Sequence, residues 1–121
     1  MALSLVTAPA TEPLTLAEAK LHLRVDTTDE DALIDALITA AREYVEVFTH
    51  RALLTQTWDY ALDDFPQGWV IDLPKAPLVS VTSVSYVDQG GTLTVWPLVN
   101  YAVDAPAGPH ARQGRIVPGF N

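Results

Sequence analysis

The sequence predicts an α+β fold, in which an N-terminal two-helix hairpin precedes a small antiparallel β-rich portion. Apolar residues recur at three- and four-residue spacing up to Arg51, as on one face of a helix. After Arg51 they alternate with polar residues, as in half-buried strands. Helix-start signals precede both helical stretches, and turns rich in Asp, Pro or Gly separate the alternating ones.

The chain is expected to divide into a lead-in and one compact unit. Residues 1–13 contain Pro9 and Pro13 and are predicted to be an extended lead-in. Residues 14–51 are predicted to form the helical hairpin and residues 52–121 the β-rich portion, which together make the compact unit.

The first helix is expected from about Leu16 to Arg24. Thr15 and Glu18 have the spacing of a capping box, in which the threonine hydroxyl accepts a backbone N–H and the glutamate accepts the N–H of the cap residue. Leu23 lies toward its end on the apolar stripe, so the helix is predicted to be amphipathic.

The second helix is expected over about residues 29–48. A second capping box is predicted at its start, formed by Thr27 with Glu30 or, in a shifted frame, by Thr28 with Asp31. Acidic residues in this turn suit the positive end of the helix dipole.

One wide apolar face is predicted on this second helix. Arg42 and Glu46, four residues apart, are placed on the opposite face and are expected to pair at the surface. The apolar face consists of Leu33, Ile34, Leu37, Ile38, Ala41, Tyr44, Val45 and Phe48.

The β-rich portion is expected to hold five strands. They are predicted at residues 54–62, 69–73, 79–87, 92–96 and 98–103. The alternation slips between Val81 and Val84, which predicts a bulge near Thr82 and Ser83. Turns are predicted at residues 63–68 and 88–91, and an irregular loop before residues 115–118.

Composition and charge exclude several classes of function. The net charge of −8 argues against binding nucleic acid by neutralising its phosphates. There is no cysteine, hence no disulfide or zinc–thiolate site, and no apolar run is long enough to span a membrane.

No catalytic, metal-binding or cofactor-binding residues are predicted, and the chain is not expected to be an enzyme. The acidic turn at residues 26–31 lacks the Gly and Glu of an EF-hand loop, since Asp31 and Leu37 occupy those places. His22, His50 and His110 have no partner at metal-ligand spacing. No nucleophile elbow or phosphate-binding loop is present.

Three tryptophans fall in predicted strands. Trp58, Trp69 and Trp96 are interpreted as core or subunit-interface residues because of their large apolar area, with Trp96 at an edge. The alternative interpretation is a small β-rich module that binds carbohydrate through these rings.

Several stretches, taken in order, resemble one known family. They begin with LTLAEAKLHLRVD at residues 14–26 and DEDALIDALITAAREYVE at residues 29–46. They continue with RALLTQTW at 51–58, LPKAPLVSV at 73–81 and GRIVP at 114–118. The chain thereby resembles the head–tail connector (adaptor) proteins of long-tailed phages, in the version with a β-rich insert.

The resemblance implies a virion structural protein at the head–tail junction, assembled in the host cytoplasm. Family members commonly form a twelvefold ring that binds the portal protein and a tail-side connector or terminator protein. DNA passes through the ring without specific binding, and no membrane or cofactor is involved. Relatives usually continue into further helix after the GRIVP segment, so a shortened chain and a minimal member both stay open.

The wide apolar face of the second helix exceeds what the short first helix can cover. We therefore expect part of it to pack on the β-rich portion and part on a neighbouring subunit. The residues predicted for the oligomer interface are Leu33, Leu37, Tyr44 and Phe48, together with the loop around Trp69. A tail-completion or tail-terminator ring is the alternative within the virion.

Overall fold

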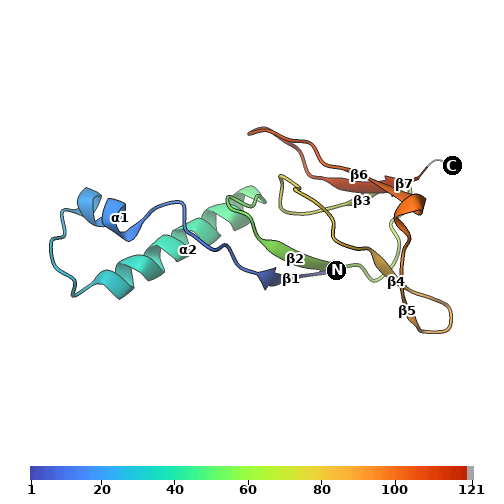
Figure 1. The fold of residues 1–121 in the computed structure, drawn as a ribbon, viewed down its shortest axis with the longest axis horizontal. Helices are drawn as coiled ribbons and strands as arrows, with labels where there is room; N and C mark the ends of the chain where they lie inside the picture. The colour runs from blue at the N-terminus through green and yellow to red at the C-terminus, as the bar shows by residue number, and fades with distance from the viewer. Residues whose placement is uncertain (120–121) are drawn as a thin grey trace. The chain divides into compact units, whose positions relative to one another are not determined.

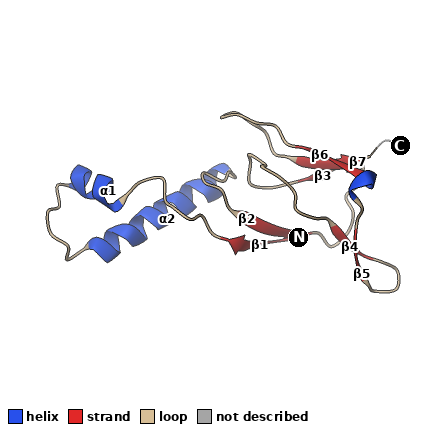
Figure 2. Cartoon of the chain, viewed as in Figure 1, coloured by secondary structure: helices blue, strands red, loops and turns tan. Residues whose placement is uncertain are grey.

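The computed structural model describes residues 1–119 and confirms the α+β class (Figures 1 and 2). Two helices, α1 (Leu16–Leu23) and α2 (Asp31–Thr49), are preceded by one strand and followed by short strands. The strands are β1 (Ala2–Thr7), β2 (Thr57–Ala61), β3 (Ile71–Asp72), β4 (Ser85–Val87), β5 (Leu93–Val95), β6 (Tyr101–Asp104) and β7 (Arg115–Pro118). A 3-10 helix, η1 (Leu98–Asn100), precedes β6.

The chain separates into two compact units. The helical unit holds residues 2–60, and the β unit holds Met1 and the described residues from Ala61 onward. The division falls inside the predicted β-rich portion, near the end of the strand expected at residues 54–62. The helical unit therefore has its own small sheet, in which β1 is hydrogen-bonded to β2.

The predicted capping box of α1 is confirmed. The Thr15 hydroxyl accepts the N–H of Glu18 at 3.1 Å, and the Glu18 carboxylate accepts the N–H of Thr15 at 3.0 Å. The helix ends where Arg24 takes up the left-handed conformation, with φ of 58°. The start of α1 is thus set by a local interaction between two residues three positions apart.

The second predicted capping box is wrong. Helix α2 begins at Asp31, its N-cap is Glu30, and no side chain caps it. Asp31 instead accepts a hydrogen bond from the Lys20 ammonium group at 2.7 Å. The Asp31 carboxylate therefore takes part in a tertiary ion pair between the two helices and not in a local cap.

The β unit is built on the antiparallel sheet β3–β7–β6. Ile116 on the central strand faces Ile71 on one side and Val103 on the other, and it is almost completely buried. The Trp96 ring lies 5.5 Å from that of Tyr101 and 6.1 Å from that of Phe65. These rings extend the apolar core next to the sheet.

Several predicted strands are shorter than expected. Of residues 79–87 only Ser85–Val87 forms a strand, because only this part has a partner strand, β5. The segment expected as a strand at 98–103 begins as the 3-10 helix η1. Trp69, expected to start a strand, lies in a turn with φ of 64°, and its N–H donates to the carbonyl of Pro66.

Candidate functional site

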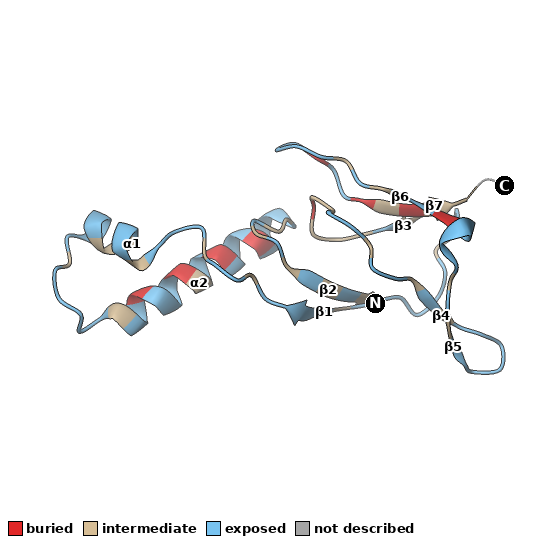
Figure 3. Cartoon of the chain, viewed as in Figure 1, coloured by how far each residue is buried: buried red, intermediate tan, exposed pale blue. Residues whose placement is uncertain are grey.

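One side of α2 is buried within the helical unit, and the opposite side is exposed. Its buried residues recur at four-residue spacing: Ile34, Ile38, Arg42 and Glu46. In Figure 3 these positions form red bands on a helix that is otherwise mostly exposed. The expectation that Arg42 and Glu46 pair at the surface is therefore wrong. They do pair, but their side chains are only 6% and 3% exposed.

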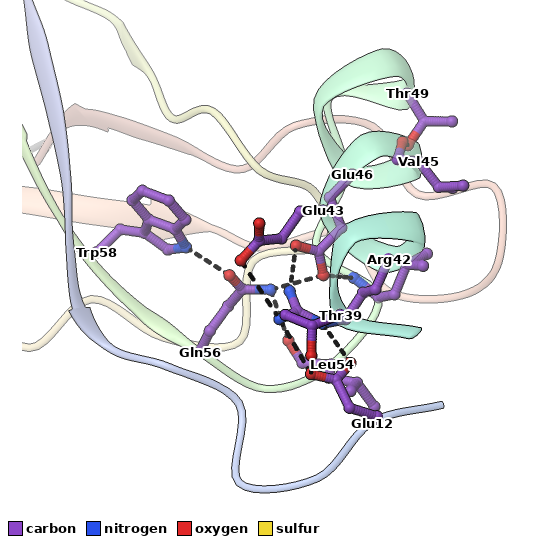
Figure 4. A network of polar contacts seen from close by, with 11 residues as sticks. Glu12, Thr39, Arg42, Glu43, Val45, Glu46, Thr49, Leu54, Gln56 and Trp58 are labelled. Carbon is purple, nitrogen blue, oxygen red and sulfur yellow. Dashed lines mark hydrogen bonds and ion pairs between the residues drawn. The ribbon is translucent and has the colours of Figure 1, made fainter. Parts of the chain in front are cut away.

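Arg42 is the centre of a polar network inside the helical unit (Figure 4). Its Nε donates to Glu12 Oε2 at 2.6 Å, and its Nη1 donates to Glu46 Oε2 at 3.0 Å. The Thr39 hydroxyl also donates to Glu12, at 3.0 Å. The hydrogen bond from Arg42 lowers the pKa of Glu12, and the same bond raises the pKa of Arg42.

The network continues from Glu46 to the start of β2. Glu46 Oε1 accepts the N–H of Leu53 at 3.0 Å and the side-chain amide of Gln56 at 2.9 Å. The Gln56 carbonyl oxygen accepts the indole N–H of Trp58 at 2.9 Å. Among the described residues, no buried side-chain nitrogen or oxygen lacks a hydrogen-bond partner. The network thus fastens the segments before and after α2 to the helix.

The opposite side of α2 carries an exposed apolar surface, which we call the outer stripe. Leu33 and Leu37 are each 57% exposed, and Tyr44 and Phe48 are 72% and 76% exposed. The Tyr44 and Phe48 rings stack with their centroids 6.3 Å apart. The full stripe consists of Leu33, Leu37, Ala40, Tyr44, Val47 and Phe48.

The spacing within the outer stripe is that of a packing seam. Leu33, Leu37, Ala40, Tyr44 and Val47 alternate steps of four and three residues, the pattern by which helices pack side by side. Charged residues flank this seam but do not interrupt it. An exposed apolar surface of this kind is typical of a site that another protein covers.

All five residues predicted for the oligomer interface are exposed. Four of them lie on the outer stripe, and Trp69, 80% exposed, lies in the β unit. That they belong to one interface stays a prediction. Trp58 and Trp96 are half-buried and engaged within their own units, by the hydrogen bond to Gln56 and by ring packing.

The remaining polar candidates do not converge. His22 and His110 are exposed, and His50 ends α2 in the left-handed conformation, with φ of 55°. Within residues 1–119, no three His, Cys, Asp or Glu side chains are arranged to hold a metal ion. No helix in this part of the chain is long and apolar enough to cross a membrane.

An α+β fold that carries exposed apolar surfaces of this kind is typical of a structural protein that packs against other chains. Residues 13–87, more than half of the chain, match the sequence profile of the phage gp6-like head-tail connector proteins. The chain belongs to this family.

A solved structure supports the assignment. The chain is similar to a chain of the "neck of empty GTA particle computed with C6 symmetry", with 30% identity and a TM-score of 0.75. The match covers 98% of the chain and spans 60% of the length of the chain in that structure. No curated protein matches the sequence significantly.

Proposed function

We propose that this protein is the subunit of a ring that joins the portal to the tail at the head–tail junction of a phage-like particle. The observation that carries the proposal is the likeness over almost the whole chain to a chain in the neck of a GTA particle, a structure computed with C6 symmetry. Its function is mechanical: the ring holds portal and tail together and leaves a passage for DNA. The ring has no catalytic role.

A ring of one repeated chain needs two different surfaces on each subunit, which meet around the ring. The outer stripe is one of them. A twelvefold ring, the expected number, also contains a sixfold axis and is therefore compatible with the symmetry of the neck structure. The portal protein and a tail-side protein are the partners at the two ends of the ring.

The charge of the subunit suits a passage for DNA. With a net charge of −8, a wall built from this chain repels phosphates and does not hold the passing duplex. This repulsion does not depend on the apolar surfaces. It predicts no retention of DNA on the isolated protein at physiological salt.

The test is a measurement of assembly mass for the wild type and for the variants Leu37→Asp and Tyr44→Asp. Mass photometry is run on the protein alone and with the portal protein of the same phage-like particle. We expect a ring in at least one condition. We also expect each variant to weaken assembly by about tenfold or more, because a carboxylate replaces an apolar contact. Both positions are more than half exposed, so the monomer should keep its fold.

The matched control is Ala32→Asp, an exposed position of α2 outside the outer stripe. It introduces the same charge on the same helix and should leave assembly unchanged. A protein that stays monomeric in both conditions and does not bind the portal contradicts the proposed function. Binding to a tail tube in place of the portal would identify the alternative, a tail-terminator ring.

A further inference from the structure

The β4–β5 hairpin has one apolar face that nothing in its unit covers. Val87 and Leu93 are cross-strand partners, and Val95 follows on the same side, paired with Ser85. The three apolar side chains are exposed by 64%, 71% and 64%. We call Val87, Leu93 and Val95 the hairpin face.

The hairpin is ordered before any partner binds. Asp88 Oδ1 accepts the N–H of Gly90 at 2.8 Å and that of Thr92 at 2.9 Å, which fixes the turn. Tyr86 and Thr94, on the other side of the two strands, are half-buried. The hairpin face is therefore held outward on a preformed support, so little ordering entropy is lost on docking.

The hairpin face and the outer stripe both lack charged side chains. Residues 84–96 contain one charged side chain, Asp88, which lies in the turn. The outer stripe contains none. Two copies that each carry a net charge of −8 repel one another, so contact between them is favourable where both surfaces are uncharged and apolar.

We propose that the hairpin face of one copy of this chain packs on the outer stripe of the next copy. This inference rests on the proposed function, since a closed ring requires two different surfaces that meet head to tail. The hairpin face is in the β unit and the outer stripe in the helical unit, so each copy carries both partners of the contact. A flat two-stranded face against a helix is a common way to bury apolar side chains.

The absence of cysteine makes the contact directly testable. One preparation carries Tyr44→Cys on the outer stripe and a second carries Leu93→Cys on the hairpin face, two positions of nearly equal exposure. The two are mixed, allowed to assemble with or without the portal, and treated with a short bismaleimide. We expect mixed dimers, formed about tenfold or more faster than in the control, because assembly raises the effective concentration of the two thiols.

The control pairs Tyr44→Cys with Val79→Cys, an exposed valine of the same unit outside the hairpin face. A chain that carries both Tyr44→Cys and Leu93→Cys should give a ladder of cross-linked species that ends at the ring. Equal cross-linking in the control would overturn the proposal, and so would dimers only between two copies of Tyr44→Cys.

The assembly mass separates this proposal from the proposed function. A wild type that forms the ring while the mixed pair stays at the control level means that another surface covers the outer stripe. In that case the proposed ring is retained, and the hairpin face is available for a different contact. Failure of all assembly, with no cross-linking above the control, contradicts both.

Discussion

Arg42→Met removes the cation that pairs with three carboxylates of the helical unit, those of Glu12, Glu43 and Glu46. Methionine keeps much of the length and volume of the side chain, so the change is mainly the loss of charge and of the hydrogen bonds to Glu12 and Glu46. Glu46 is then left as a buried charge, 3% exposed, whose donors among the described residues are the N–H of Leu53 and the amide of Gln56.

The expected cost follows from this burial. Removing one partner of a buried ion pair costs about 3–5 kcal/mol, because the other charge stays buried without compensation. Since Glu46 keeps two neutral donors, we expect the lower end, about 3 kcal/mol. A second substitution that makes Glu46 neutral, Arg42→Met with Glu46→Gln, should recover part of this loss.

The assay is urea unfolding followed by circular dichroism at 222 nm, which reports on α1 and α2 and hence on the helical unit. The control is Glu43→Gln in the same unit, which removes an ion pair with an exposed carboxylate: the Glu43 side chain is 62% exposed and lies 3.8 Å from Arg42. Exposed pairs contribute about 0–1 kcal/mol, so this variant should unfold close to the wild type. A loss below about 1 kcal/mol for Arg42→Met would refute the reasoning.

Three further predictions concern single positions. The pKa of Glu12 is lower in the folded state than in the unfolded chain. The ionised Glu12 side chain therefore stabilises the fold above its unfolded pKa, and this stabilisation is lost as the pH falls through its folded pKa. Glu12→Gln should therefore lose less stability than the wild type on acidification below about pH 4. Thr15→Ala removes the capping box and should destabilise the helical unit by about 0.5–2 kcal/mol, with faster amide exchange at Glu18. Gly114→Ala would place a methyl group in steric overlap with the Leu78 side chain, so we expect the β unit to lose about 1–3 kcal/mol in thermal unfolding, with α1 and α2 unchanged.

Local signals in the sequence predicted local structure well. The capping box at Thr15 and the Asp–Gly turn at residues 88–91 are both confirmed, because each depends on residues within four positions of one another. The alternation in β2 is also confirmed, with Trp58 and Tyr60 half-buried and their neighbours exposed.

The failures arose where a distant residue decides the outcome. The periodicity of α2 identified an apolar side but not which part of it the chain itself covers. Arg42 is buried because the segment that holds Glu12, thirty residues earlier, packs against it. A partner so far away in the sequence cannot be predicted from a local pattern. The second capping box failed for a similar reason, since Lys20 draws Asp31 into an ion pair.

The outer stripe was only partly predictable. Leu33, Leu37, Tyr44 and Phe48 were identified by spacing, whereas Ala40 and Val47 were missed because they lie at the margin of the predicted apolar side. The hairpin face was not identified at all. Its three residues stand on two strands, and only the register that pairs Val87 with Leu93 places them together.

The two sides of α2 have different roles, and this difference affects how the protein can evolve. The side that holds Arg42 and Glu46 fixes the structure of the helical unit, and a substitution there disturbs the hydrogen bonds of the whole network. The outer stripe contributes little to that shape, so its residues can change with small effects on folding. In the proposed ring, substitutions on one side of a single helix can therefore adapt the contact between subunits, while the other side keeps the subunit folded.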